Sequence, residues 1–265
     1  MKDQTNLTLL KVLNTVAFLI MVTVNALANI LPINGVTTGE VSDSYKNLFA
    51  PAGITFSIWG LIYLLLALFI VYQLGLLKRF STPQDNVIKE ISMPFIISSL
   101  ANAAWIFAWH YNQIWITLIL MLVILVSLGI VFVRLHKADL SGFEKVFIRL
   151  AFSVYFGWIT IATIANVTTF LVSVGWNGRA ISEPVWTVII LIVGILIGMV
   201  TAIKYKDIAY GLVILWAYIG ILIKHLSKTG FDGEYPIVIT IVVICSVIAL
   251  LCIGYIAFKK VRGLR

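Results

Sequence analysis

One polar and two aromatic side chains recur at helical spacing in an otherwise apolar stretch, Ser99 to His110 (SLANAAWIFAWH). Asn102, Trp105 and Trp109 lie at i, i+3 and i+7, so on a helix they share one face. An amide donates and accepts hydrogen bonds, and an indole offers a flat stacking surface. The face could therefore bind a flat, largely apolar ligand. The alternative is that it only joins neighbouring membrane helices or anchors a helix end at the membrane interface.

Amide or aromatic side chains also share one face in three other apolar segments, and one of these segments combines both types. The residues that share a face are Asn14, Asn25 and Asn29 in the first segment, Phe56, Trp59 and Tyr63 in the second, and Tyr155, Trp158 and Asn166 in a later one. The last third of the chain offers mainly Val, Ile, Leu and Gly, with Gly194 and Gly198 spaced for close helix packing. A pocket lined by indoles, phenols and a few uncharged donors is thus predicted in the first two thirds.

Residues for catalysis, metal binding or ion coupling are not found inside the apolar segments. Ten of the 11 Asp and Glu residues fall in predicted loops or tails, and Asp207 lies at the very start of a span. No span has a carboxylate near its middle, which argues against a cation- or proton-coupled transporter. The three histidines lie at predicted segment ends, and no zinc-protease, nucleophile-elbow or phosphate-loop motif is present. We therefore expect no catalytic residue, no metal site and no cofactor, and the protein is not expected to be an enzyme.

The elements that must position these residues are membrane-spanning helices. The chain is 61% hydrophobic and only 11% charged, which no soluble fold of 265 residues would tolerate. The apolar runs are long and continuous, so a β-barrel is not expected. Windows of about 20 residues predict eight spans, at 9–31, 52–77, 93–111, 113–135, 146–171, 184–204, 206–225 and 236–258, with the weakest separations near Asn112 and between Lys204 and Asp207.

The basic residues predict how these spans are oriented. With a cytoplasmic N-terminus, the outer loops hold only four of the 19 Lys and Arg residues, namely Lys46, Arg179, Lys224 and Lys228. This bias supports eight spans with both termini cytoplasmic, in the inner (plasma) membrane of a bacterial-type cell. The net charge of +8 then reflects topology, and nucleic acid is not an expected partner.

Three of these segments resemble motifs of the TspO/MBR family, the tryptophan-rich sensory or translocator proteins. Phe56–Leu65 (FSIWGLIYLL) resembles the signature F-x-x-x-W-T-x-L-Y. SLANAAWIFAW loosely resembles the third-helix pattern L-x-x-N-x-x-W, with the Asn two rather than three residues after the Leu. Tyr155–Asn166 (YFGWITIATIAN) resembles the fifth-helix pattern Y-x-x-W-x-x-x-A-x-x-x-N, with the Ala at Ala162 or Ala165. The resemblance covers about residues 9–171.

The resemblance implies a fold and a class of ligand. The family's fold is a five-helix bundle, and its members bind porphyrins, sterol-like lipids and synthetic drugs in a pocket that the first loop covers. By similarity, the residues that would approach the ligand are Trp59, Tyr63, Asn102, Trp105, Trp158 and Asn166, and Tyr155 joins them as the first residue of the fifth-helix pattern.

Two departures from the family pattern weaken the porphyrin expectation. The family's W-x-P-P-type segment between helices one and two is here NLFAPAGITF, which keeps Pro51 but has no Trp. Gly60 stands where the signature has Thr. The aromatic wall is thus retained while the ligand can differ.

The combined prediction is an all-α polytopic membrane protein of about eight transmembrane helices. Residues 9–171 would form a TspO-like five-helix bundle, and residues 184–258 a three-helix membrane extension. The expected function is to bind, sense or translocate a small apolar ligand, tetrapyrrole- or lipid-like, and the alternative is facilitated transport of a neutral solute. Membrane lipid and that ligand are the expected partners, and a homo-oligomer is compatible with the pattern.

Overall fold

The computed structural model describes residues 2–77, 79, 83–176 and 181–262, and within them every regular element is helical. The long helices are α1 (Lys2–Ile30), α3 (Ile58–Gln73), α4 (Asp85–His110), α5 (Ile114–Lys137), α7 (Leu150–Ser173), α8 (Glu183–Tyr205), α9 (Ile208–Leu226) and α10 (Pro236–Val261). Short helices α2 (Thr38–Ser44) and α6 (Gly142–Glu144) and single turns at Ile33–Gly35 and Gly53–Ser57 lie between them. Residues Lys145–Arg149 form a π-helical turn that joins α6 to α7.

The eight predicted spans are confirmed. Eight helical segments of the described residues are long and apolar enough to cross a membrane, from Thr5–Ile30 to Pro236–Val261. The two weakly separated pairs are also distinct helices. Asn112 adopts a positive φ of 54° between α4 and α5, and Lys206 one of 50° between α8 and α9. Both residues occupy the left-handed region in which a helix cannot continue.

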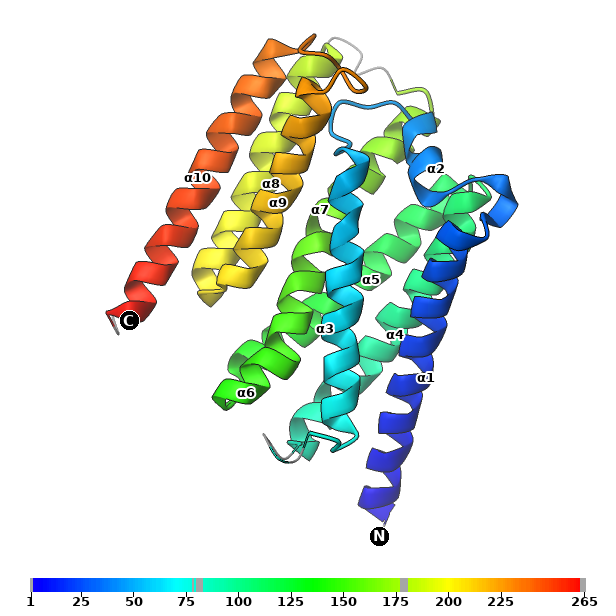
Figure 1. Ribbon diagram of the computed structural model, residues 1–265, viewed down its shortest axis with the longest axis vertical. Coiled ribbons are helices and arrows are strands. Elements are labelled where there is room, and N and C mark those ends of the chain that lie inside the picture. The colour runs from blue at the N-terminus through cyan, green and yellow to red at the C-terminus, as the bar shows by residue number, and fades with distance from the viewer. Residues whose placement is uncertain (1, 78, 80–82, 177–180, 263–265) are drawn as a thin grey trace. The chain divides into compact units, whose positions relative to one another are not determined.

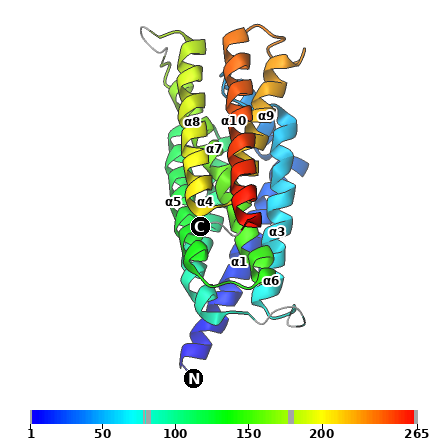
Figure 2. The same cartoon turned by 90° about the vertical axis from the view of Figure 1, so that its left-hand side faces the viewer.

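The described chain divides into two compact units. The first comprises Met1–Val41 and Trp59–Ile159, and the second Ser42–Ile58 and Thr160–Arg265. In the first unit, α4 packs against both α1 and α5 (Figure 1). In the second, α10 packs against α8 and α9, and these three helices run side by side (Figure 2). The second unit thus contains Ser42–Ile58 and the second half of α7 together with the last three helices. The predicted division into residues 9–171 and 184–258 stays a prediction.

Buried amides hold the helices of the first unit together. Asn14 of α1 donates from Nδ2 to Gln73 Oε1 of α3 at 2.8 Å and to Ser92 Oγ of α4 at 2.9 Å. Gln73 donates in turn to the backbone carbonyl of Lys11 at 3.1 Å. Such bonds are favoured in a membrane because hydrocarbon offers the amide no other partner.

Helix α4 carries a proline in its interior, and a residue of α5 compensates for it. Pro94 has no N–H, so it cannot donate to the carbonyl of Glu90 one turn earlier. The guanidinium of Arg134 donates to that carbonyl instead. The kink-prone turn of α4 is therefore tied to α5.

An acidic residue predicted to lie in a loop is buried in the first unit, where α3 ends and α4 and α6 begin. Glu144 is almost inaccessible and forms a capping box with Ser141 at the start of α6. Its carboxylate also accepts hydrogen bonds from Tyr72 at 2.7 Å and from Gln84 at 2.8 Å. Because every one of these donors is satisfied by the carboxylate, Glu144 acts as a structural cap.

In the second unit, the segment between α2 and α3 is bound to α9. The backbone N–H of Ala52 donates to the carbonyl of Gly220 at 3.0 Å, and the Trp216 indole donates to the carbonyl of Thr55 at 3.0 Å. The ring of buried His225 lies 2.9 Å from the Leu48 carbonyl through Nε2. Residues 48–55 are thus held in place by helix α9.

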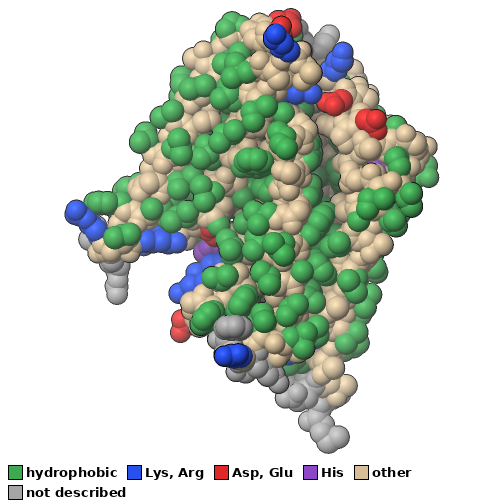
Figure 3. All heavy atoms as spheres, in the orientation of Figure 1, with side chains coloured by type: hydrophobic (Ala, Val, Ile, Leu, Met, Phe, Trp, Pro, Cys, Tyr) green, Lys and Arg blue, Asp and Glu red, His purple; other side chains and the backbone are tan. Residues whose placement is uncertain are grey.

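The outward faces of the long helices are apolar. Figure 3 shows hydrophobic side chains over the visible helix surfaces, while charged side chains gather at the helix ends. Large apolar residues of α10 such as Leu251 and Leu250 are 68% and 55% exposed. Such a surface requires lipid around it.

Candidate functional site

Trp59 is the centre of an aromatic cluster in the first unit. It lies in the first turn of α3, its ring stacks on Tyr63 one turn later with 5.5 Å between centroids, and both residues are half-buried. Trp59 also meets two rings of α7 edge-on, Tyr155 at 5.8 Å and Trp158 at 6.3 Å. Such edge-to-face pairs contribute roughly 0.5–1.5 kcal/mol each beyond their burial. Four of the seven predicted site residues are therefore in one cluster.

A chain of hydrogen bonds lies behind this cluster. Asn25 of α1 donates to Asn102 Oδ1 of α4 at 2.7 Å, and Asn102 donates to the hydroxyl of Tyr155 at 3.1 Å. The Tyr155 hydroxyl lies 3.7 Å from the sulfur of Met21. Asn102 and Tyr155 are buried, at 2% and 0% exposure. The predicted site residue Asn102 thus positions Tyr155, which in turn contacts Trp59.

Trp105 and Trp109 form a separate stack farther along α4. Their ring centroids are 4.9 Å apart and nearly parallel. Trp109 donates from its indole to the carbonyl of Thr38 at 3.1 Å, and Trp109 and the adjacent His110 are buried. Trp109 and His110 are the last two residues of α4, and the segment around Thr38 covers them. The indole N–H of Trp105 is buried and has no hydrogen-bond partner among the residues that the structure describes.

Asn166 is buried in the half of α7 that belongs to the second unit. The cluster around Trp59 belongs to the first unit. The prediction that Asn166 approaches the ligand stays a prediction.

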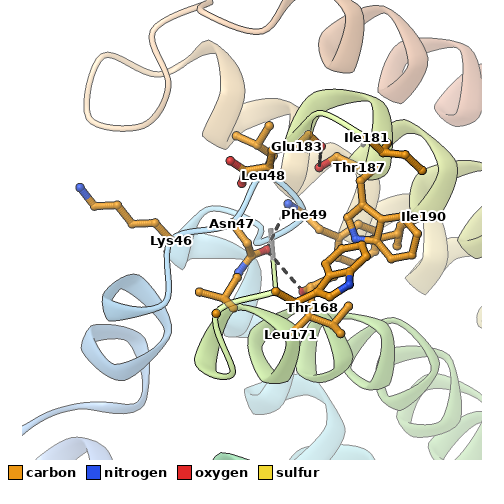
Figure 4. Close-up of a pocket in the computed structure, with 14 residues that line it drawn as sticks. Lys46, Asn47, Leu48, Phe49, Thr168, Leu171, Ile181, Glu183, Thr187 and Ile190 are labelled. Atoms are coloured by element: carbon orange, nitrogen blue, oxygen red, sulfur yellow. Dashed lines mark hydrogen bonds between the residues drawn. The ribbon is translucent and has the colours of Figure 1, made fainter. Parts of the chain in front are cut away.

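A cavity of about 420 Å³ lies in the second unit (Figure 4). Its walls come from the segment before α3, from the end of α7 and from the start of α8. None of the seven predicted site residues lines it. The lining residues are Lys46, Asn47, Leu48, Phe49, Thr168, Leu171, Val172, Gly175, Trp176, Ile181, Glu183, Trp186, Thr187 and Ile190.

Sequence reasoning missed this cavity for an identifiable reason. An indole near the end of a predicted span, such as Trp176, is typical of an interface anchor, so neither Trp176 nor Trp186 is among the predicted site residues. The two rings meet with centroids 4.7 Å apart at an angle of 63°. The available signal was a pair of indoles ten residues apart on either side of a short loop between spans five and six.

Among the residues that the structure describes, no group of three His, Cys, Asp or Glu side chains could hold a metal ion.

Outside the spans, the exposed Glu40 carboxylate accepts hydrogen bonds from the backbone N–H of Thr37 at 2.7 Å and from its hydroxyl at 2.9 Å. These two bonds, the backbone one foremost, lower the pKa of Glu40 below its usual value.

Comparison with known proteins gives one family. The family model described as TSPO-like protein matches residues 11–255, which include α8, α9 and most of α10. No curated protein and no solved structure matches the chain.

Proposed function

The chain belongs to the family of TSPO-like proteins and is a multi-pass membrane protein, and from this premise we propose that it binds a small, largely apolar ligand at the aromatic cluster around Trp59. The proposal includes a tetrapyrrole- or lipid-like ligand, an inner-membrane location with both termini cytoplasmic, and a binding role without catalysis.

The observation that carries the proposal is the arrangement of Trp59 and Tyr63. Both rings are half-buried, and the next residue, Gly60, is exposed, with no atom within 4 Å of the position a Cβ would take. The stacked pair therefore offers a flat apolar surface beside open space. Flat apolar molecules bind well to such surfaces because stacking adds to the area removed from water or lipid.

The hydrogen bonds behind the cluster hold one of its rings in place. Tyr155 is held by Asn102, which fixes the position of the ring that meets Trp59 edge-on. A wall whose rotamers are already fixed binds a ligand with little loss of side-chain entropy. Asn102 acts through Tyr155 in this proposal and need not touch the ligand.

The test is a titration of the purified protein in mild detergent with protoporphyrin, followed by tryptophan fluorescence. Saturable quenching is expected, with Trp59→Leu and Trp158→Leu weakening binding by about tenfold or more, as loss of one or two aromatic contacts implies. The matched control is Trp115→Leu, because Trp115 is 58% exposed on α5 and lies outside the cluster. Quenching that never saturates, or that Trp115→Leu lowers as much as Trp59→Leu, would refute binding at the cluster.

A further inference from the structure

We propose that the cavity of the second unit is a separate binding site, and that its ligand is a neutral molecule with an apolar body and a hydroxyl group at one end. This inference is independent of the cluster around Trp59, since the two sites share no residue.

The volume and the walls indicate a small organic ligand. A cavity of about 420 Å³ falls within the range of small-molecule sites, roughly 300–1,000 Å³. Most of the wall is apolar, with Leu48, Phe49 and Ile190 buried and the two indoles of Trp176 and Trp186 half-buried. These side chains suit a hydrocarbon or aromatic body.

The buried polar groups of the cavity indicate what the other end of the ligand must supply. Thr168 donates its hydroxyl proton to the carbonyl of Ala165 at 2.7 Å, and Thr187 donates to that of Glu183 at 2.9 Å. Each hydroxyl oxygen can then only accept a further hydrogen bond. Asn47 Oδ1 already accepts from the Phe49 N–H at 3.2 Å and lies 3.5 Å from the Thr168 hydroxyl. The ligand must therefore bring a donor.

A hydroxyl fits this requirement better than a charged group. The indoles of Trp176 and Trp186 are donors, so a ligand group that both donates and accepts can use both kinds of partner. Among the described lining residues, Lys46 and Glu183 are exposed and carry opposite charges, so these residues give the cavity no net charge. A charged head group would gain no net Coulomb attraction there and would lose hydration.

Hydrogen bonds hold the part of the cavity wall formed by residues 45–49 in a fixed conformation. Asn47 is buried, and its Nδ2 donates to the carbonyl of Tyr45 at 2.9 Å, so residues 45–49 form a tight side-chain-bonded turn. The next residue, Leu48, is bound through its carbonyl to His225 of α9. The wall segment is thus fixed from two sides.

The experiment uses photolabelling of the full-length protein in mild detergent. The probe is decanol carrying a terminal diazirine, and the comparison probe is its methyl ether, which keeps the apolar body but lacks the donor. We expect saturable labelling of peptides containing residues 46–49, the end of α7 or the start of α8, with competition by unlabelled decanol. The ether should bind about threefold to tenfold more weakly, the effect of one hydrogen bond.

Two pairs of variants test the location and the chemistry. Ile190→Trp fills the cavity and should abolish saturable labelling, whereas Ile189→Trp, on the exposed face of the same helix, should leave it unchanged. Thr187→Val keeps the shape of the wall and removes one hydroxyl. It should therefore reduce the difference in binding affinity between the alcohol probe and its methyl ether. It serves as the second test should Ile190→Trp fail to fold, as judged by circular dichroism.

Three outcomes would overturn the proposal: labelling that does not saturate or spreads evenly over the lipid-facing residues of α8 and α10, equal binding of alcohol and ether, or retention of the saturable site in well-folded Ile190→Trp. If protoporphyrin still quenches the tryptophan fluorescence of Ile190→Trp saturably, the two sites are independent. Failure of protoporphyrin binding at Trp59 would leave the cavity result unchanged.

Discussion

Thr55 packs directly against the backbone of Gly220, and only a glycine fits there. A Cβ at residue 220 would lie 2.0 Å from Thr55 Oγ1 and 2.6 Å from its methyl group. The adjacent hydrogen bonds from Ala52 to Gly220 and from Trp216 to Thr55 hold the same contact. The side chain of Thr55, in the segment before α3, therefore packs directly on the backbone of helix α9.

Gly220→Ala should push this segment off α9. We expect a loss of about 1–3 kcal/mol of stability, typical of overpacking a buried contact. Thermal unfolding in detergent measures the loss. Gly254→Ala on α10, where a Cβ would meet no atom within 4 Å, is the control and should be neutral or slightly stabilising. A neutral Gly220→Ala would show that the segment is not held as described.

The hydrogen bond between Asn102 and Tyr155 should be worth measurable coupling energy. Asn102→Leu and Tyr155→Phe each leave a buried polar group without its partner, so the double variant should lose less than the sum of the two. In membranes such coupling averages about 0.6 kcal/mol and reaches about 2 kcal/mol. A double-mutant cycle of unfolding free energies measures it, and Tyr255→Phe, half-exposed on α10, should have little effect. Strict additivity of the two changes would contradict a direct bond.

The bond from Arg134 to the Glu90 carbonyl should matter only while Pro94 is present. Arg134→Met should destabilise the protein by about 1 kcal/mol, because it removes the donor that compensates for the proline. In a Pro94→Ala background the new N–H can serve the carbonyl, so the same change should cost less. Lys137→Met, exposed on the same helix, is the control. An Arg134→Met effect that is equal in both backgrounds would disprove the compensation.

The titration of Glu40 should report on the capped start of α2. Because its folded pKa lies below the ordinary value, the carboxylate stabilises the folded state above its unfolded pKa, and this contribution is lost as pH falls through the folded pKa. Thr37→Val removes the hydroxyl bond but keeps the backbone N–H, the larger cause, so the pKa should rise only part of the way. Carbon-detected NMR titration of the Glu40 carboxyl measures this. A pKa that already has its ordinary value in the unmodified protein would contradict the two bonds.

Much of the fold could be predicted because its signals are local. Long apolar runs predicted the eight helices, and the left-handed residues Asn112 and Lys206 fall within the two weak separations that were identified. The spacing of Gly194 and Gly198 also predicted close packing correctly, since a Cβ at either would lie within 3.0 Å of Tyr218 or Ile214 of α9.

The candidate site was predicted less completely. Trp59, Tyr63, Tyr155 and Trp158 share helix faces in the sequence, and the other three rings each meet Trp59. Gln73 and Ser92, the partners of Asn14, gave no comparable signal, because a single amide or hydroxyl in an apolar helix does not reveal which helix it faces. The cavity depends on Asn47 and Thr168, which are 121 residues apart.

The sequence by itself determined that this is an eight-span helical membrane protein with an aromatic and amide-bearing first part, since hydropathy and periodicity act within one helix. Only the tertiary structure decided that Asn25 bonds to Asn102, that Thr55 rests on Gly220, and that Trp176 and Trp186 enclose a cavity. The physical reason is that lipid and protein interior are equally apolar to a side chain. Hydropathy therefore cannot tell a lipid-facing residue from a buried one, and the rotation of each helix against its neighbours settles the pairing.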